Sequence, residues 1–500
     1  MDNLNVKQQL DEPTAASRRF TRFRTARVGP PFVPELLQFS VVLLDASILL
    51  SVASLTYGFG GIFPRLAADQ FTFGALAAAI VTTLVQANMG LYRVDALLEP
   101  RRNLWRVVLG CLLSFVVVGL AIRALRVGPV VAQPWLLQLF LASTTAICAG
   151  RLAFTSAVAA ASRRGLFSRN VVVIGAGPWG SRMVQLLEER ERPWTRILGV
   201  FDHCERGELK TRPQRVRGYS VLGNTQDLIT FARRIRVDEI FIAMPWSEAY
   251  RIEEALDAVR VVPANIHLGP QALGLGVADK KFADLDGIPV VSVATKPVSG
   301  WGLFMKWMLD KSVAVAALTL LSPLLIAVAI AIRLDSPGPI FFRQKRYGFN
   351  NKLIGVFKFR TMHHHMTDHT AEKLATRDDP RITRVGRVLR RTSIDELPQL
   401  INVLKGDMSI VGPRPHATNA KAGTSLYQDV VAEYACRHRI KPGITGWAQL
   451  HGWRGETDTE VKIIKRVEHD FYYIDNWSIA LDLYIIAATA LTLPFQKNAF

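Results

Sequence analysis

The chain has 500 residues, 49% of them hydrophobic, and its 61 Lys and Arg residues against 42 Asp and Glu residues give a formal charge of +19. This length accommodates two or three domains as well as membrane segments, and the charge favours nucleic acid, anionic lipid or phosphorylated small molecules as partners. The four cysteines have neither CxxC nor Cys/His spacing, which argues against a disulfide framework and a zinc site.

The first 160 residues are predicted to form a membrane domain. A polar arm occupies residues 1–34, and four long apolar stretches follow within residues 35–160, at about 36–58, 70–92, 104–122 and 135–158. Each approaches the ~20 residues that a helix needs to cross the hydrocarbon core of a bilayer. Lys and Arg residues concentrate in the arm and after the fourth stretch, which places both in the cytoplasm by the positive-inside rule.

Two charged residues, Asp45 and Arg151, lie in or near these predicted spans. Charged groups inside a membrane are costly, so they either pair between helices or mark a functional site. Because no neighbouring residue completes a pathway, we favour a role in helix packing or at the membrane interface.

Residues 165–297 have the pattern of a Rossmann-like, doubly wound α/β domain. Val171–Ile174 reads as a buried strand, and the turn Gly175-x-Gly177-x-x-Gly180 follows it and opens a helical pattern. In dinucleotide-binding proteins such a turn lets a pyrophosphate approach a helix N-terminus. A second apolar run ends at Asp202, where a ribose-binding acid would sit. The glycines also suit the tight turns of any parallel sheet, so a bound nucleotide and a purely structural turn both remain open.

Residues 301–335 contain an apolar stretch that is interrupted near its middle. Pro323 removes a backbone donor and its ring crowds the carbonyl of Thr319, so a straight helix is broken or bent there. Ser322 can bond a carbonyl in its own helix and help to satisfy the opened turn. Lys and Arg residues flank both ends, which places both ends in the cytoplasm. We therefore favour a re-entrant helix over a kinked spanning helix, which would send the remaining residues to the far side.

Residues 336–500 form the last predicted domain, and its first part carries more Lys and Arg than Asp and Glu. Beside a membrane, such a surface favours anionic head groups and phosphorylated substrates. Nucleic acid is not expected as a partner, because no aromatic-interleaved RNA platform or DNA-reading helix pattern appears. The segment FKFRTM includes Lys358 and Arg360, which either bind phosphate or line a solvated strand edge. The final segment, DLYIIAATALTLPF, is too short to span and is expected to lie at the membrane interface.

An acidic pair, Asp395 and Glu396, lies in the run RRTSIDELPQL. Ser393 and Glu396 have the spacing of a helix capping box. A helix N-terminus would also keep both carboxylates ionised, and an ionised carboxylate beside the cations Arg390 and Arg391 can attack phosphorus or hold Mg²⁺. The residues alone favour the cap.

Arg414 lies between Pro413 and Pro415. The two prolines restrict the backbone, so the guanidinium is presented with little conformational entropy left to lose. A fixed Arg after a Gly suits phosphate recognition; a plain turn explains the run equally well.

Five motifs together resemble the bacterial polyprenyl-phosphate sugar-phosphate transferases, the monotopic phosphoglycosyl transferases. In chain order they are LLSPLL, DSPGPIFFRQKRYG, FKFRTM, SIDELPQLINVLKGDMSIVGPRP and KPGITGWAQL. The four spans and the Rossmann-like domain before them are similar to the large form, typified by undecaprenyl-phosphate glucose phosphotransferases. The resemblance is highly specific over residues 322–450 and architectural before them.

The resemblance implies an activity and roles for individual residues. The family would transfer a hexose 1-phosphate, with glucose expected, from a UDP-sugar to undecaprenyl phosphate and release UMP, the first membrane step of exopolysaccharide or capsule assembly. Asp395 would be the nucleophile that forms an aspartyl-phosphosugar intermediate, assisted by Glu396 and by Mg²⁺ bound at Asp395. Ser322-Pro323 would be the break that makes the membrane helix re-entrant. The expected phosphate-binding residues are Lys358, Arg360, Arg390, Arg391 and Arg414.

By the same resemblance, a mainly helical catalytic domain would face the cytoplasm at the inner membrane of a bacterium, in contact with the lipid bilayer, and the chain is expected to be a homodimer. One alternative is a membrane-bound nucleotide-sugar dehydratase or epimerase, which would need a second glycine-rich fold and a Tyr-x-x-x-Lys pair that the sequence lacks after residue 300. The other is a non-enzymatic membrane scaffold that senses nucleotides at the Gly175–Gly180 turn.

Overall fold

The computed structural model describes most of the chain. The described residues are 34–58, 68–124, 132–163, 168–189, 194–204, 213–269, 282–285, 288–366, 379–416, 421–422, 425–431, 433–453 and 459–492. The described residues from Arg169 onward belong to one compact unit, and those from Pro34 to Ser168 belong to another. The predicted N-terminal arm lies almost entirely outside the described residues.

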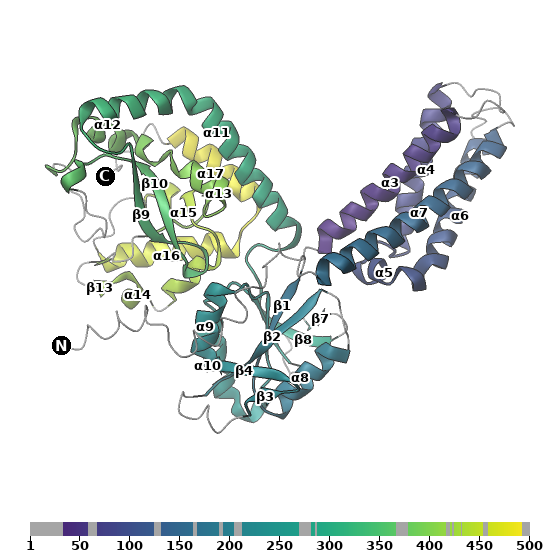
Figure 1. The fold of residues 1–500 in the computed structure, drawn as a ribbon, viewed down its shortest axis with the longest axis horizontal. Coiled ribbons are helices and arrows are strands. Elements are labelled where there is room, and N and C mark those ends of the chain that lie inside the picture. The colour runs from purple at the N-terminus through teal and green to yellow at the C-terminus, as the bar shows by residue number, and fades with distance from the viewer. Residues whose placement is uncertain are drawn as a thin grey trace. The chain divides into compact units, whose positions relative to one another are not determined.

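The first unit is a bundle of helices (Figure 1). Its helices are α3 (Pro34–Gly58), α4 (Ala68–Asn88), α5 (Val94–Leu98), α6 (Pro100–Ala124) and α7 (Ala132–Arg163). Three of the four predicted spans are long and apolar enough to cross a membrane, over Glu35–Tyr57, Pro100–Ala124 and Trp135–Ser162. For the remaining predicted span, the apolar stretch found within α4 among the described residues is the shorter one Thr72–Asn88. The fourth described helix that meets the length and composition of a span is α11 (Gly300–Asp335).

Asp45 and Arg151 pair inside this bundle. Arg151 donates from Nη2 to Asp45 Oδ2 at 2.5 Å and also donates to Gln86 Oε1. The Tyr92 hydroxyl donates to the same Asp45 oxygen at 3.1 Å. The pair therefore links α3, α4 and α7, as expected for charges that pack helices together.

An eight-stranded mixed sheet organises residues 168–297, called here the α/β domain. Its elements are β1 (Arg169–Ile174), α8 (Pro178–Glu189), β2 (Thr195–Asp202), β3 (Arg215–Val216), β4 (Tyr219–Asn224), α9 (Thr225–Arg234), β5 (Glu239–Ile242), η4 (Trp246–Glu248), α10 (Ala249–Val259), β6 (Asn265–Leu268), β7 (Phe282–Leu285) and β8 (Ile288–Ala294). The strand order is β3-β4-β2-β1-β5-β6-β8-β7. Strands β4, β2, β1, β5 and β6 pair in parallel, whereas β3, β7 and β8 join in antiparallel pairs.

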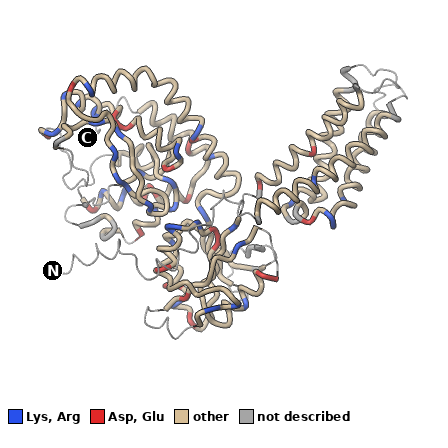
Figure 2. Tube along the Cα trace, viewed as in Figure 1, with Lys and Arg blue, Asp and Glu red and all other residues tan. Residues whose placement is uncertain are grey.

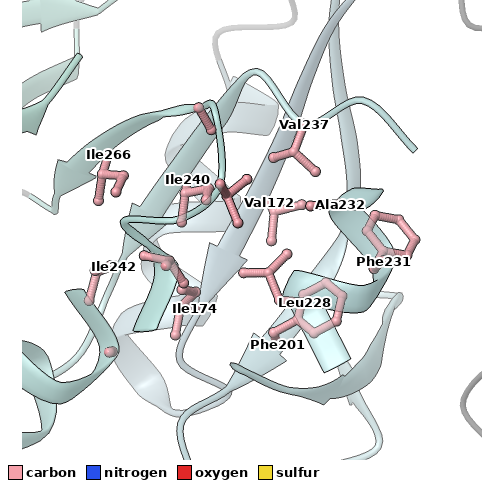
Figure 3. Close-up of a cluster of buried hydrophobic side chains, with 14 of the residues drawn as sticks. Val172, Ile174, Phe201, Leu228, Phe231, Ala232, Val237, Ile240, Ile242 and Ile266 are labelled. Atoms are coloured by element: carbon pink, nitrogen blue, oxygen red, sulfur yellow. The ribbon is translucent and has the colours of Figure 1, made fainter. Parts of the chain in front are cut away.

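The core of this sheet follows from the alternation of side chains along β1. Val172 and Ile174 face Leu228 and Phe231 of α9 in one apolar cluster (Figure 3). Val171 and Val173, the alternate residues of β1, pack in a second cluster with Met183 and other residues of α8. Helices therefore cover both faces of the sheet, in line with the predicted alternation of strands and helices.

Residues 300–492 form the C-terminal domain. Its helices are α11 (Gly300–Asp335), α12 (Arg384–Thr392), α13 (Gln399–Lys405), α14 (Tyr427–Val430), α15 (Trp447–Leu450), α16 (Glu460–Asp475) and α17 (Ile479–Thr492), with the 3₁₀ turns η6 (Phe349–Asn351), η7 (His364–Met366), η8 (Ile394–Glu396) and η9 (Tyr434–Arg439). Its strands are β9 (Phe341–Tyr347), β10 (Leu353–Phe359), β11 (Ser409–Val411), β12 (Lys421–Ala422), β13 (Ser425–Leu426) and β14 (Gly443–Thr445). Strands β9 and β10 form an antiparallel ribbon, and α13 packs on both β10 and α11.

Helix α11 continues through Pro323 but bends along its length (Figure 1). The Ser322 hydroxyl donates to the Thr319 carbonyl at 2.8 Å, the carbonyl whose helical donor Pro323 removes. This confirms the expected local repair of the opened turn. No charged residue occurs in the middle of the helix (Figure 2), where Leu320 is 80% exposed and Ile326 is 61% exposed.

Candidate active site

The acidic pair lies at a sharp change of direction between two helices. Helix α12 ends at Thr392, and Ser393 adopts the left-handed conformation with φ 59° before Asp395 and Glu396 enter the 3₁₀ turn η8. The Ser393 side chain does not cap η8, so the predicted capping box is wrong. The physical reason is that Ser393 serves as the C-terminal cap of α12, a left-handed position that more often takes glycine or asparagine.

Glu396 is held by two cations. Lys358 of β10 donates from Nζ to Glu396 Oε1 at 2.8 Å. Arg414 donates from Nη2 to Oε1 at 2.6 Å and from Nη1 to Oε2 at 3.0 Å, a two-point contact between planar groups. Burial favours the neutral acid, but the charges of Arg414 and Lys358 outweigh it and hold the pKa of Glu396 well below its usual range.

Asp395 has a different environment from its neighbour. Both carboxyl groups are buried, at 8% exposure each, yet Asp395 makes no hydrogen bond or ion pair within the described part of the chain. Burial raises the pKa of Asp395 above its ordinary value, and the Glu396 charge raises it further against the lowering effect of Lys358. Glu396 is therefore kept ionised by Arg414 and Lys358, and not by a helix N-terminus as the sequence suggested, while burial shifts the pKa of Asp395 the other way.

The other predicted phosphate-binding residues differ in their exposure and in their hydrogen-bond partners. Arg390 donates from Nε to Thr361 Oγ1 at 3.0 Å, and its charge lowers the pKa of Asp395. Arg391 is exposed, and no hydrogen bond joins it to the acidic pair among the described residues. Arg360 is 3% exposed and donates to the Ser336 carbonyl at 2.6 Å and the Pro337 carbonyl at 2.8 Å. Its guanidinium therefore holds the end of α11 in this structure, and its contact with phosphate stays a prediction.

The sequence analysis missed Arg346 of β9. Its Nη1 donates to the Pro415 carbonyl at 2.7 Å, next to Arg414. Burial and the neighbouring Arg414 charge lower the pKa of Arg346 to about 10, while Glu396 and Asp395 act in the opposite direction. In the run FFRQKRYG, Arg346 follows Gln344 at the two-residue spacing that places both side chains on one face of a strand, which is the signal that the sequence contained. In the structure Arg346 Nε donates to Gln344 Oε1 at 3.1 Å.

A second buried network supports Arg414 from behind. Arg437 is 1% exposed and donates from Nη2 to the Arg414 carbonyl at 2.9 Å and to Asp470 Oδ2 at 2.6 Å. Its Nη1 lies 2.6 Å from His416 Nδ1. Burial and the charges of Arg437 and Arg466 hold the pKa of His416 well below its usual range, so this imidazole is neutral. The backbone on both sides of Arg414 is thereby fixed.

The arrangement is suited to chemistry on a phosphorylated substrate. The buried Asp395 carboxylate, which has no hydrogen-bond partner among the described residues, stands beside a second carboxylate that two cations already neutralise. Fixed cations stabilise negative charge that develops at phosphorus without reorganising. The described residues contain no group of three or more His, Cys, Asp or Glu that could hold a metal ion by itself. Mg²⁺ commonly takes one or two carboxylates together with substrate phosphates and water, and Asp395 offers such a carboxylate.

Comparison with known proteins identifies the family. Residues 301–496 match the bacterial sugar transferase family. The chain is 34% identical over 448 residues to a UDP-glucose:undecaprenyl-phosphate glucose-1-phosphate transferase of Xanthomonas campestris pv. campestris, which covers 87% of this chain and 91% of that protein. The chain belongs to the bacterial sugar transferase family. This sugar transferase is an enzyme, and its long apolar helices make it a membrane protein.

Two further relatives agree with this assignment. The sugar transferase is 38% identical over 350 residues to the UDP-glucose:undecaprenyl-phosphate glucose-1-phosphate transferase of Escherichia coli (strain K12), covering 66% of this chain and 73% of the relative. It is 39% identical over 334 residues to an undecaprenyl-phosphate glucose phosphotransferase of Komagataeibacter xylinus, covering 67% and 60%. Residues 87–270 also match the family described as a CoA-binding domain.

Proposed function

We propose that this sugar transferase moves glucose 1-phosphate from UDP-glucose to undecaprenyl phosphate, as the first membrane step of exopolysaccharide or capsule assembly. The observation that carries the proposal is the unequal acidic pair: Glu396 is neutralised by Lys358 and Arg414, which leaves the Asp395 carboxylate available. The names of the X. campestris and E. coli relatives supply the donor and the acceptor.

The reaction would proceed by two displacements at one phosphorus atom. A carboxylate oxygen of Asp395 attacks the β-phosphorus of UDP-glucose, and the bond from that phosphorus to the bridging oxygen breaks. The electron pair stays on the departing α-phosphate, so UMP is released and an aspartyl-phosphoglucose remains. A phosphate oxygen of undecaprenyl phosphate then attacks the same phosphorus, and the bond to Asp395 breaks to regenerate the carboxylate. Covalent catalysis divides one difficult transfer into two easier steps.

Positive charge is required because an anion attacks a dianionic diphosphate. Lys358, Arg346 and Arg414 lie beside the pair and supply fixed positive charge. Mg²⁺ bound at Asp395 would neutralise diphosphate charge, which one carboxylate and the substrate phosphates together suit. Glu396 holds Lys358 and Arg414 in place, and Arg390 adds a further cation next to Asp395.

The membrane arrangement follows from how α11 is anchored. Near its beginning, Lys306 is buried and donates to the Val411 carbonyl at 2.9 Å and to Asp482 Oδ2 at 2.7 Å. At its end, Asp335 Oδ2 accepts from the Val385 backbone N–H at 3.1 Å. A straight helix of 36 residues would be about 54 Å long. Two ends fixed to one compact domain with an exposed apolar bend between them support a re-entrant helix that dips into the bilayer and returns.

This placement accounts for how the two substrates meet. The apolar middle of α11 and the exposed Leu483 and Leu491 of α17 would enter the cytoplasmic leaflet of the bacterial inner membrane. The acidic pair would then lie at the depth of the lipid phosphate while remaining accessible to a soluble nucleotide sugar. We also expect a homodimer, as the family resemblance implies.

The decisive experiment uses the purified full chain with undecaprenyl phosphate, Mg²⁺ and a panel of UDP-sugars, scored for UMP. Asp395→Asn is expected to lose at least about 10³-fold in rate, because an amide cannot act as the nucleophile. Incubation with UDP-glucose labelled in the sugar should attach label to the wild type and not to Asp395→Asn. Asp407→Asn, a carboxylate change away from the pair, is the matched control and should behave as the wild type.

Two outcomes would favour the alternatives. If Asp395→Asn releases UMP as fast as the wild type, the covalent step at Asp395 is wrong. If no UDP-sugar yields UMP but a nucleotide still binds, a non-enzymatic scaffold that senses nucleotides is favoured. Release of a 4-keto sugar nucleotide in place of UMP would indicate the dehydratase or epimerase, which the family match does not favour.

A further inference from the structure

A cavity of about 670 Å³ opens in the α/β domain, away from the acidic pair. Its lining includes Trp179 and Arg182 of α8 as well as Met244 and Trp246, which follow β5. Its floor is formed by residues at the ends of β5 and β6. A volume in this range, an apolar lining and a few polar groups are typical of sites for small ligands.

The position of the cavity in the sheet is as informative as its lining. Strand β1 has β2 on one side and β5 on the other. From β1 the chain first builds outward through β2 and β4, and then returns to add β5 and β6 on the other side of β1. The order of the strands therefore reverses between β1 and β5. In open α/β sheets ligands bind at this reversal, beyond the carboxyl ends of the strands, and the cavity lies there.

The glycine turn beside the cavity contains one glycine that the fold does not require. Gly175 needs its φ of 121°, and a Cβ at Gly180 would lie 1.8 Å from the Gly175 carbonyl oxygen, so both are fixed by the backbone. At Gly177 a Cβ would meet no atom within 4 Å, and its φ is not in the left-handed region. A glycine in open space at the start of α8 is the position where a phosphate approaches the backbone in nucleotide-binding folds.

The predicted ribose contact is not part of this site. Asp202 is 3% exposed, and its Oδ1 accepts from the backbone N–H groups of Ala176 at 3.3 Å and His203 at 3.1 Å. This carboxylate therefore stabilises the glycine turn through its hydrogen bond with the Ala176 backbone. The cavity begins instead at Ala243 and Met244, and the carbonyl of Ala243 lies where a Cβ of Gly175 would be, so turn and cavity adjoin each other.

We propose that this cavity binds a nucleoside diphosphate at a second site, separate from the transferase site. The base would stack on the indoles of Trp179 and Trp246, because every base offers a flat face to an aromatic ring. The diphosphate would extend toward Gly177 and the N-terminus of α8, with Arg182 as its cation. Trp179 is 45% exposed, so part of its indole is accessible for a base to stack on. The proposal does not depend on the reaction at Asp395.

The test is equilibrium binding of radiolabelled ADP and, separately, of radiolabelled UDP to the full chain. Gly177→Val should abolish one binding site per chain, because the new methyl groups occupy the path of the phosphates while the open space tolerates them in the fold. Trp179→Ala should weaken the same site at least about 10-fold. Tyr250→Ala, which removes an aromatic ring that is 65% exposed on α10 and does not line the cavity, should change nothing.

A third variant separates the two sites. Arg414→Ala disrupts the transferase site and should leave the binding that Gly177→Val removes. Loss with ADP alone, with UDP alone or with both would support the proposal and identify the base that the cavity accepts. The proposal is overturned if Gly177→Val, shown to be folded by its thermal transition, binds both nucleotides as the wild type does, or if all binding disappears in Arg414→Ala.

Discussion

The α/β domain and the C-terminal domain bury different kinds of group. The sheet of the α/β domain is covered on each face by an apolar cluster of Val, Ile, Leu and Phe residues. In the described α/β domain the buried carboxylates Glu239 and Asp238 also have partners, in His267 and in the less buried Lys296. The C-terminal domain has an apolar cluster too, but it also places Lys and Arg side chains in buried ion pairs between elements far apart in the sequence. These pairs are Lys306–Asp482, Lys358–Glu396 and Arg437–Asp470.

The difference teaches how a site for phosphate chemistry can be held in place. Apolar contacts stabilise a fold but do not require a particular orientation of the side chains. A buried charge that is hydrogen-bonded requires a defined geometry. Lys306 joins α11 to α17, and Arg437 joins η9 to α16 directly behind Arg414. The C-terminal domain therefore buries charged groups, at a cost in desolvation, and the hydrogen bonds of these groups fix the positions of its cations.

The largest expected effect breaks the buried pair at Lys306. Lys306→Met leaves Asp482 buried at 0% exposure without its cation, which should destabilise the C-terminal domain by about 3–5 kcal/mol. Hydrogen exchange resolved by peptide should show faster exchange in α11 and α17 while the α/β domain stays protected. Equally faster exchange in both domains would contradict the expectation that the buried ion pair stabilises the C-terminal domain alone.

The matched change in the other domain is Leu228→Ala. Leu228 is fully buried against β1, so its truncation should cost about 2–5 kcal/mol. Exchange should now accelerate in α9 and β1. UMP release per folded molecule should stay within about twofold of the wild type, and a larger fall would mean that the apolar core also positions the active site.

Arg414→Lys sharpens the comparison within the active site. A Lys keeps the charge but loses the two-point contact with Glu396, so UMP release should fall about 10²-fold with little loss of stability. Arg360→Lys is the companion variant, because Arg360 contacts carbonyls at the end of α11 instead of the acidic pair. Arg360→Lys should lower the free energy of unfolding while the rate of UMP release per folded molecule changes little. A large fall in rate without a loss of stability would indicate that Arg360 acts in the active site.

The smallest expected effect is a dependence of stability on pH at His438. Burial, together with the charges of Arg437 and Arg233, lowers the pKa of His438 to about 3. The unfolded chain takes up a proton below about pH 6.5 and the folded protein does not, so the free energy of unfolding should fall by about 1.4 kcal/mol per pH unit between these values. His438→Phe should lessen the loss between pH 7 and pH 5 by about 2 kcal/mol in urea unfolding. The exposed His451→Phe should not, and an equal effect would assign the dependence to another group.

Several features could be predicted from the sequence because they depend on interactions between residues close together in the chain. Length and apolarity predicted three of the spans, and the strand followed by Gly175 and Gly180 predicted the turn that opens α8. Pro323 predicted a bend, and Ser322 was predicted to bond a carbonyl of its own helix, which the structure identifies as that of Thr319. Each of these depends on neighbours within about one helical turn or one strand, which the sequence states directly.

Only the tertiary structure decided how the charged residues divide their roles. Arg360 and Lys358 are two residues apart on the same segment, yet one holds the end of α11 and the other contacts Glu396. Asp395 and Glu396 are adjacent, yet their pKa values move in opposite directions because Arg414, from a distant segment, reaches only one of them. A charge acquires its role from the burial and the partners that folding brings to it, and those long-range neighbours are not encoded in any local pattern.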